Sequence, residues 1–239
     1  MVTMWIKVVN SKDLKQDGRW KVELFTTTDK QVESPYKMIK IKELVKERKE
    51  NIKPFEFPDR PFNYIGLENV TPQTGELVNF NPKKGNEIKS TSKVFHEGDV
   101  LYARLRPYLN KVYLATANYE IEEGICSGEF HVLQPDTSKV LPNYLRTVLS
   151  SSYIQNYVKF MQTGSALPRL GIKDLMELEV PLPPLEVQSH FETFIINKIK
   201  RIATLKKELN SLPEMMISTV ENSLESGAIE GGHNLEITV

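Results

Sequence analysis

Pro181-Leu-Pro-Pro184 divides the sequence of 239 residues into two unlike parts. Three prolines in four residues force an extended backbone, because each proline fixes its own φ and keeps the residue before it out of the helical region. The segment 185–225 that follows has no glycine and a single proline, so its composition predicts helix throughout. The part before the prolines mixes strand and helix patterns. The sequence therefore predicts an α+β protein with a mixed, β-rich globular domain at 1–180, long helices forming a coiled-coil-like spacer at 181–227 and a flexible tail at 228–239.

An apolar seam runs along the predicted helical region. Its members recur every seven residues, as in a coiled coil, and are Ile195, Ile202, Leu209 and Met216. Ser211-Leu-Pro-Glu214 has the form of a capping box with proline in the first turn, which predicts that a second helix begins there and that Gly227 ends it. The seam fits two alternatives equally well: packing on its own domain, or pairing with a partner helix.

The globular part alternates apolar and polar residues with a period of two, which is typical of strands. Runs of this kind lie at 62–67, 99–106, 111–115 and 129–133, between turn signals such as Glu97-Gly-Asp99. A helix is predicted over 142–161, followed by a short helix and a strand up to Val180. Near the N-terminus, the pattern predicts a strand around Trp5–Val9 and a short surface helix over 39–49.

The overall composition limits the class of protein. The 31 basic residues balance the 31 acidic ones, which excludes a histone-like polycation and an acidic disordered tail. A single cysteine cannot form an internal disulfide, so we expect a reducing compartment. Neither a signal peptide nor a run of about 18 apolar residues is evident, so the predicted location is the cytoplasm, away from membranes.

Residue patterns for catalysis are weak. Cys126 lies in Gly124-Ile-Cys-Ser-Gly128, but a strand follows it where a nucleophile elbow needs a helix. Asp59, Glu87 and Lys89 loosely match the metal site of a nuclease, and the four histidines lack metal-ligand spacing. We therefore predict no catalytic residue, no metal and no cofactor. A metal-dependent nuclease using Asp59, Glu87 and Lys89, and a helical protein-interaction adaptor, remain as alternatives.

The neutral total charge hides a local basic segment at 83–111. It contains seven basic and three acidic residues, a net charge of +4, with tyrosines and neutral hydrogen-bonding side chains interleaved. Lysine and arginine bind phosphates, and base edges in the major groove are read by Arg, Lys, Asn and Gln. The segment is a candidate nucleic-acid surface, although most basic clusters of this size are simply solvated.

Six stretches in register resemble the specificity subunits of type I restriction–modification systems. They are Phe62-Asn-Tyr-Ile-Gly-Leu-Glu-Asn-Val70 with Thr74-Gly75, Glu87-Ile-Lys-Ser90, Phe95 to Lys111, Gly124-Ile-Cys-Ser-Gly-Glu-Phe130, Thr163-Gly-Ser-Ala-Leu-Pro-Arg169, and Pro181-Leu-Pro-Pro-Leu-Glu-Val-Gln188. The resemblance covers residues 36–227. It implies a non-catalytic protein whose target-recognition domain grips one half of a split site in double-stranded DNA. It also implies that the helical spacer sets the distance to the other half and docks the methyltransferase subunits, and that a nuclease-translocase (restriction) subunit joins for restriction.

This sequence departs from the usual family plan in one respect. The common form has two recognition domains and two helical segments, whereas this sequence has one of each. Our hypothesis is a half-size subunit whose helices pair antiparallel with a second copy; pairing with a different half and a truncated product remain alternatives.

The candidate DNA contacts fall into three groups. Phosphate contacts from loops are assigned to Lys83, Lys84, Lys89 and Lys93. Arg104, Arg106 and Lys111 flank a strand and its turn, and could serve either DNA or the fold. The loop residues Gly164, Ser165 and Arg169 complete the set, with a helix cap as the alternative role of Gly164.

Overall fold

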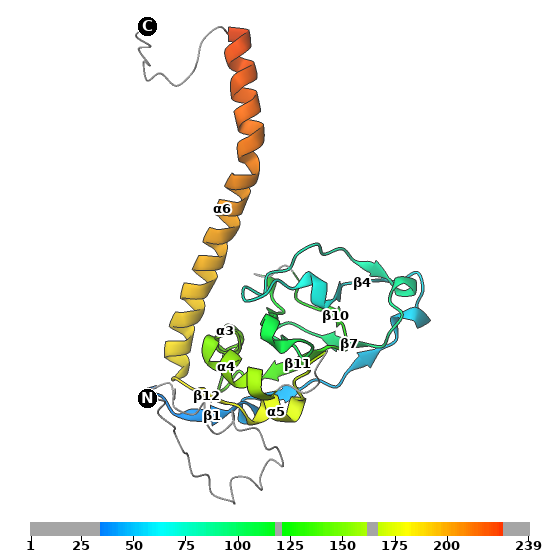
Figure 1. Ribbon diagram of the computed structural model, residues 1–239, viewed down its shortest axis with the longest axis vertical. Coiled ribbons are helices and arrows are strands. Elements are labelled where there is room, and N and C mark those ends of the chain that lie inside the picture. Colours follow the sequence, from blue (N-terminus) through cyan, green and yellow to red (C-terminus); the bar gives the residue numbers. More distant parts are fainter. Residues whose placement is uncertain (1–33, 118–120, 162–166, 227–239) are drawn as a thin grey trace, which may run out of the picture. The chain divides into compact units, whose positions relative to one another are not determined.

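The structure, a computed structural model, describes residues 34–117, 121–161 and 167–226 (Figure 1). The chain divides into two compact units, the first ending at Glu192 and the second beginning at Thr193. One helix, α6 (Leu185–Ser226), starts in the first unit and makes up the described part of the second. The strand predicted around Trp5–Val9 and the tail predicted at 228–239 lie outside the described residues.

The first unit contains an antiparallel four-stranded sheet in the order β2-β11-β8-β9. Its strands are β2 (Val45–Glu47), β8 (Val100–Ala103), β9 (Val112–Leu114) and β11 (Phe130–Pro135). All residues of β8 and β9 are buried, as expected for strands covered on both faces. These strands confirm the predictions at 99–106, 111–115 and 129–133.

A second four-stranded sheet has the order β3-β7-β10-β5. Its strands are β3 (Asn51–Ile52), β5 (Tyr64–Ile65), β7 (Ser92–Phe95) and β10 (Gly124–Cys126), with β10 parallel to β5 and antiparallel to β7. Two pairs complete the strands: β4 (Pro61–Phe62) with β6 (Lys83–Lys84), and β1 (Met38–Lys40) with β12 (Glu179–Pro181). Phe95 of β7 packs edge-on against Tyr113 of β9, with 6.5 Å between ring centroids, so the core joins the two four-stranded sheets.

The short helix predicted over 39–49 is wrong. The segment forms β1, the 3-10 turn η2 (Ile41–Glu43) and β2 instead. Ile39 pairs with Val180, and Val45 with Pro135. An isolated helix of this length is marginal, whereas β-branched residues fit a strand that finds partners elsewhere in the chain.

The helix predicted over 142–161 is two helices, α3 (Pro142–Leu149) and α4 (Ser152–Met161). The second helix begins after Ser151, whose Oγ accepts from the Ile154 N–H at 3.5 Å in the position of an N-cap. The Ser150 and Ser151 hydroxyls also donate to the carbonyls of Arg146 at 3.0 Å and Val148 at 2.6 Å. The short helix and strand predicted after them are confirmed as α5 (Ile172–Glu177) and β12.

The second helix predicted to begin at Ser211 is also wrong, because α6 continues through Pro213. The Ser211 hydroxyl donates backward to the Glu208 carbonyl at 2.8 Å, and therefore does not cap a new helix. Proline costs one backbone hydrogen bond in a helix interior, and the axis of α6 bends in this part of its length (Figure 1). None of the helices in the described ranges has the length and hydropathy needed to cross a bilayer.

The start of α6 is fixed to the first unit by Gln188, whose side chain is fully buried. Its Oε1 accepts from the Leu141 N–H at 2.8 Å, and its Nε2 donates to the carbonyls of Lys139 at 3.0 Å and Pro183 at 2.8 Å. Phe191, one turn further on, packs against Tyr144 of α3 with 6.1 Å between ring centroids. One amide thus joins α6, the chain before α3 and the proline segment.

Candidate DNA interface

Three of the predicted DNA contacts lie on or next to a small β-ribbon. We call the β4 and β6 strands, with the 3-10 turns η3 (Pro54–Glu56) and η5 (Gly85–Glu87) that contact each other, the β4–β6 ribbon. Lys83 and Lys84 form β6 itself and so do not lie in a loop as predicted, while Lys89 follows η5. Lys84 and Lys89 are exposed. The Lys83 ammonium lies 4.9 Å from the Tyr64 ring centroid and 3.6 Å from Glu68 Oε1, so it is partly engaged within the protein.

The ammonium groups of Lys93 and Lys111 bind to other groups of the protein. Lys93 Nζ lies 3.4 Å from Glu47 Oε1, and both side chains are mostly buried. Lys111 Nζ donates to the Leu67 carbonyl at 2.7 Å. DNA contacts by these two residues remain predictions, and each would require a new side-chain position.

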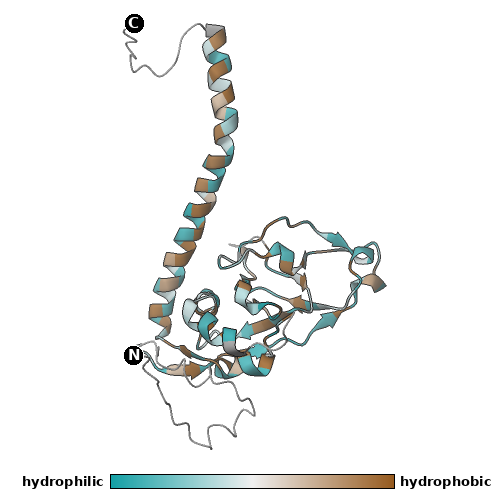
Figure 2. Ribbon diagram, viewed as in Figure 1, coloured by the Kyte–Doolittle hydropathy of each residue, from teal (hydrophilic) through white to brown (hydrophobic). Residues whose placement is uncertain are grey.

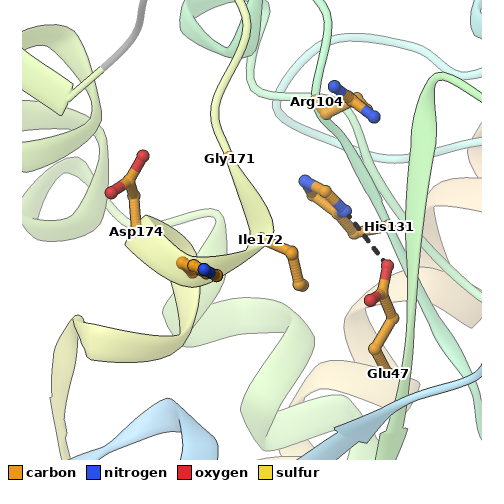
Figure 3. A pocket seen from close by; sticks show the side chains of 7 residues that line it. Glu47, Arg104, His131, Gly171, Ile172 and Asp174 are labelled. Carbon is orange, nitrogen blue, oxygen red and sulfur yellow. Dashed lines mark ion pairs between the residues drawn. The ribbon is translucent and has the colours of Figure 1, made fainter.

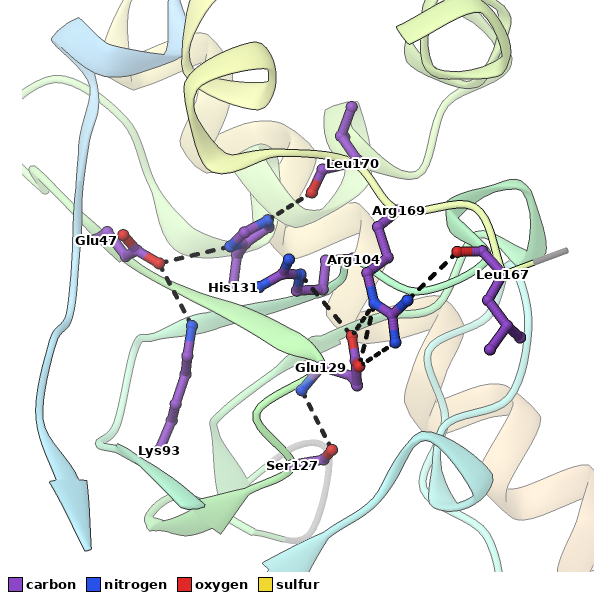
Figure 4. A network of polar contacts seen from close by, with 9 residues as sticks. All are labelled: Glu47, Lys93, Arg104, Ser127, Glu129, His131, Leu167, Arg169 and Leu170. Carbon is purple, nitrogen blue, oxygen red and sulfur yellow. Dashed lines mark hydrogen bonds and ion pairs between the residues drawn. The ribbon is translucent and has the colours of Figure 1, made fainter. Parts of the chain in front are cut away.

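Arg104 and Arg169 share one carboxylate, that of Glu129 (Figure 4). Arg169 Nη2 donates to Glu129 Oε1 at 2.7 Å and its Nε to Oε2 at 3.1 Å, while Arg104 Nε lies 3.8 Å from Oε2. The bidentate contact holds the pKa of Glu129 below and that of Arg169 above their usual ranges. The three side chains are about one-third exposed, so phosphate can compete with Glu129 for either guanidinium.

Arg106 points into solvent from a strained backbone. Its φ of 47° is in the left-handed region, and its N–H donates to the Pro168 carbonyl at 2.7 Å. This bond and the Leu105–Arg169 bridge tie the end of β8 to the segment that follows Gly164 and Ser165. Gly164 and Ser165 themselves lie outside the described residues.

A hollow of about 510 Å³ opens beside Arg104 (Figure 3). Its lining comes from Glu47, Arg104, His131 and the start of α5, Gly171 to Asp174. Two cations and two carboxylates line it together, so it has no strong preference for an anion.

His131 lies in the wall of this hollow and is almost fully buried. Its Nε2 bonds to the Leu170 carbonyl at 2.9 Å, which requires a proton on that nitrogen, and its Nδ1 lies 3.5 Å from Glu47 Oε1. Burial lowers the pKa of His131, so the neutral ring is favoured in the folded protein.

Glu87 and Cys126, two of the residues considered for catalysis, have structural roles. Glu87 Oε2 accepts from the Lys84 N–H at 2.6 Å and so closes turn η5, whereas Asp59 is exposed between η3 and β4. Cys126 is buried in β10, where burial raises the pKa of its thiol far above neutrality. In the described ranges, no three His, Cys, Asp or Glu side chains come together as a metal site.

The sequence interpretation missed residues at the tip of the ribbon, by which we mean residues 53–60, the segment that contains turn η3 and leads into β4. Phe55 and Phe57 are exposed on and after turn η3, and Arg60 lies beside Phe57. The available signal was the run of prolines at 54, 58 and 61, which prevents regular structure and leaves the intervening side chains outside the core.

The family assignment follows from a comparison with protein-family models. The model of the type I restriction modification DNA specificity domain matches residues 33–214, more than half of the chain. The chain belongs to this family. The specificity subunit is the non-catalytic component of a type I system, so family membership confirms that the chain is not an enzyme.

Curated relatives of this specificity domain are longer proteins. The type I restriction enzyme EcoDI specificity subunit of Escherichia coli is 24% identical over 158 residues, which is 66% of this chain and 33% of the relative. The HindI specificity subunit of Haemophilus influenzae is 29% identical over 138 residues, 54% of this chain and 30% of the relative. The alignments thus span about a third of the curated relatives.

Solved structures confirm the fold. The HsdS subunit from Thermoanaerobacter tengcongensis superposes with a TM-score of 0.62 at 21% identity, over 88% of this chain and 54% of that one. A chain from a study of assembly and conformational transition of the type I R-M system gives a TM-score of 0.60 at 22% identity, over 85% and 52%. The specificity-domain chain thus has the expected globular domain and long helix, and spans about half of each of these structures.

Proposed function

We propose that this chain is the sequence-recognition component of a type I restriction–modification system, and that its first unit binds one half of a bipartite DNA target. The family match over residues 33–214 carries the proposal. The exposed cations Lys84, Lys89 and Arg106 on the first unit add a surface of the charge that DNA phosphates require.

The second unit supplies the means to reach the other half-site. Three of its four seam side chains are exposed, Ile202, Leu209 and Met216 at 50%, 65% and 68%, and Ile195 is partly buried. Figure 2 shows apolar and polar residues interleaved along α6. Because the chain aligns with about half of each of two solved type I chains, a second copy pairing antiparallel along α6 would supply a second globular unit and helix. Pairing with a different half-size subunit is the alternative outcome.

The same proposal assigns partners to the assembled pair. A methyltransferase subunit docks on the helical region, and a restriction subunit joins the complex. The assembly takes place in the cytoplasm, the compartment that holds the DNA. The solved chain from the study of type I complex assembly supports this by fold alone. Pull-down of the methyltransferase subunit by the full chain, and its loss when 193–226 is changed, tests the docking.

A selection from randomised duplexes at near-physiological salt tests the DNA function directly. Two inverted half-sites at fixed spacing are expected for a symmetric dimer. Two different half-sites would indicate a mixed pair. Absence of enrichment, with and without the methyltransferase subunit, would contradict the proposal.

A further inference from the structure

The tip of the β4–β6 ribbon combines exposed aromatic rings with exposed positive charge. Phe55 and Phe57 are each 44% exposed, and Figure 2 shows apolar residues at this turn. The exposed cations on and beside the ribbon are Lys53, Arg60, Lys84 and Lys89; the exposed acids there are Glu56, Asp59 and Glu87, and Lys53 Nζ lies 3.2 Å from Glu56 Oε1. The cations outnumber the acids by one. Lysine is depleted in the centre of protein–protein interfaces, whereas DNA-binding surfaces are rich in positive charge, so this excess favours DNA over a protein.

Backbone hydrogen bonds, a glycine contact and buried side chains fix the shape of the ribbon. The Gly85 N–H donates to the Arg60 carbonyl at 3.0 Å, and the Asn86 N–H to the Pro58 carbonyl at 3.1 Å. A Cβ at Gly85 would lie 2.1 Å from the Phe57 carbonyl oxygen, so only glycine permits this approach of η5 to η3. Phe62 and Ile88 are buried with Ile125 under the ribbon. The exposed rings are therefore not needed to fill the core.

Arg60 stacks on one of the exposed rings, Phe57, and on the buried ring of Phe62. Its guanidinium carbon lies 4.9 Å from the Phe62 ring centroid and 5.9 Å from that of Phe57. Stacking restricts the side chain while its edge donors remain available, which is the geometry suited to bidentate hydrogen bonds with O6 and N7 of guanine.

We propose that this tip reads bases in the major groove, with Phe55 and Phe57 against thymine methyl groups and Arg60 on guanine. The proposal rests on the proposed function and adds the element and the chemistry of readout. A two-stranded ribbon fits the width of the major groove, and the thymine methyl is the apolar group exposed there. Lys84 and Lys89, on the neighbouring strand and loop, contact the flanking phosphates.

Uracil-for-thymine substitution tests the aromatic contact. The probes are duplexes selected by the wild-type chain and copies in which single thymines are replaced by uracil, which removes only the methyl group. Wild type should lose about fourfold in affinity per contacted thymine, from the burial of one methyl group. The Phe55→Ala/Phe57→Ala variant should bind both duplexes equally, with an unchanged salt dependence. Tyr36→Ala, an exposed aromatic before β1, is the matched control and should behave as wild type.

Arg60→Lys gives a second, independent readout. It keeps the charge and loses the bidentate geometry, so the selected motif should lose a guanine preference while non-specific binding is retained. If the double phenylalanine variant selects the wild-type motif with the same uracil sensitivity, the inference is wrong and the proposed function stands. The inference is equally wrong if that variant keeps the motif but no longer retains the methyltransferase subunit, because the rings then bind protein. If wild type itself selects no motif, even with the methyltransferase subunit, both proposals fail.

Discussion

Replacing Gln188 with methionine should loosen the anchored start of α6 at a large cost in stability. Methionine matches the shape of glutamine, but leaves one partly buried N–H, that of Leu141, and two carbonyls, those of Lys139 and Pro183, without the amide that pairs them. A buried polar group that loses its partner costs about 1–3 kcal/mol, and an unpaired carbonyl lies nearer the low end of that range, since under-satisfied carbonyls are tolerated more often than orphaned N–H groups. The full loss at the Leu141 N–H and the smaller losses at the two carbonyls, reduced by the hydrophobic gain from burying methionine, should lower the free energy of unfolding by about 3 kcal/mol. That is a large share of the roughly 5–15 kcal/mol that stabilises a domain.

Urea unfolding of wild type and of Gln188→Met, followed by circular dichroism, measures this cost. His190→Met, on the exposed side of the same helical segment, is the control. Hydrogen exchange adds a local readout, since the Leu141 amide should lose protection in Gln188→Met and keep it in the control. A change of less than about 0.5 kcal/mol with the Leu141 amide still protected would refute the reasoning, because surface substitutions already produce differences of that size.

Three further predictions concern the seam, the basic surface and the buried histidine. Ile202→Asp with Leu209→Asp places charges in the seam, so sedimentation should show monomers at concentrations where wild type is dimeric; a wild type that is monomeric at tens of micromolar contradicts self-pairing. Lys84→Ala with Lys89→Ala should reduce the log–log salt slope of DNA binding by about 1.8, from a slope of about 0.9 per phosphate contact, and an unchanged slope would remove both from the interface. Burial lowers the pKa of His131 in the folded state, so the unfolded chain takes up the proton first as pH falls below about 6.5. Wild type should therefore lose up to roughly 1.4 kcal/mol per pH unit below that point relative to His131→Gln, measured by denaturation, and parallel pH profiles of the two would exclude this role.

Local patterns were enough to predict much of the fold. Strands β8, β9 and β11, and the helical character of the segment after the prolines, follow from alternation and from the proline segment, which are properties of neighbouring residues. The segment at 39–49 could not be predicted in this way, because its strands pair with β12 and β11 from far along the chain. The break between α3 and α4 falls at Ser150 and Ser151, and only the structure shows that Ser151 caps the second helix, since Ser211 does not interrupt α6.

The candidate interface was predictable in its charge and not in its geometry. Composition located the basic segment, but could not show that Glu129 binds Arg169 from a position 40 residues away, or that Lys111 is used by a backbone carbonyl. Nor could it show that Phe55 and Phe57 lie outside the core, since apolar residues are normally expected inside it.

The construction of the β4–β6 ribbon has a consequence for how such a protein can diversify. Gly85, Phe62 and Ile88 determine the shape of the ribbon, and the side chains at its tip contribute little to it. Exchanges at the exposed positions can therefore accumulate with little loss of folding free energy, and a lineage can acquire a new target preference without first passing through an unstable ancestor.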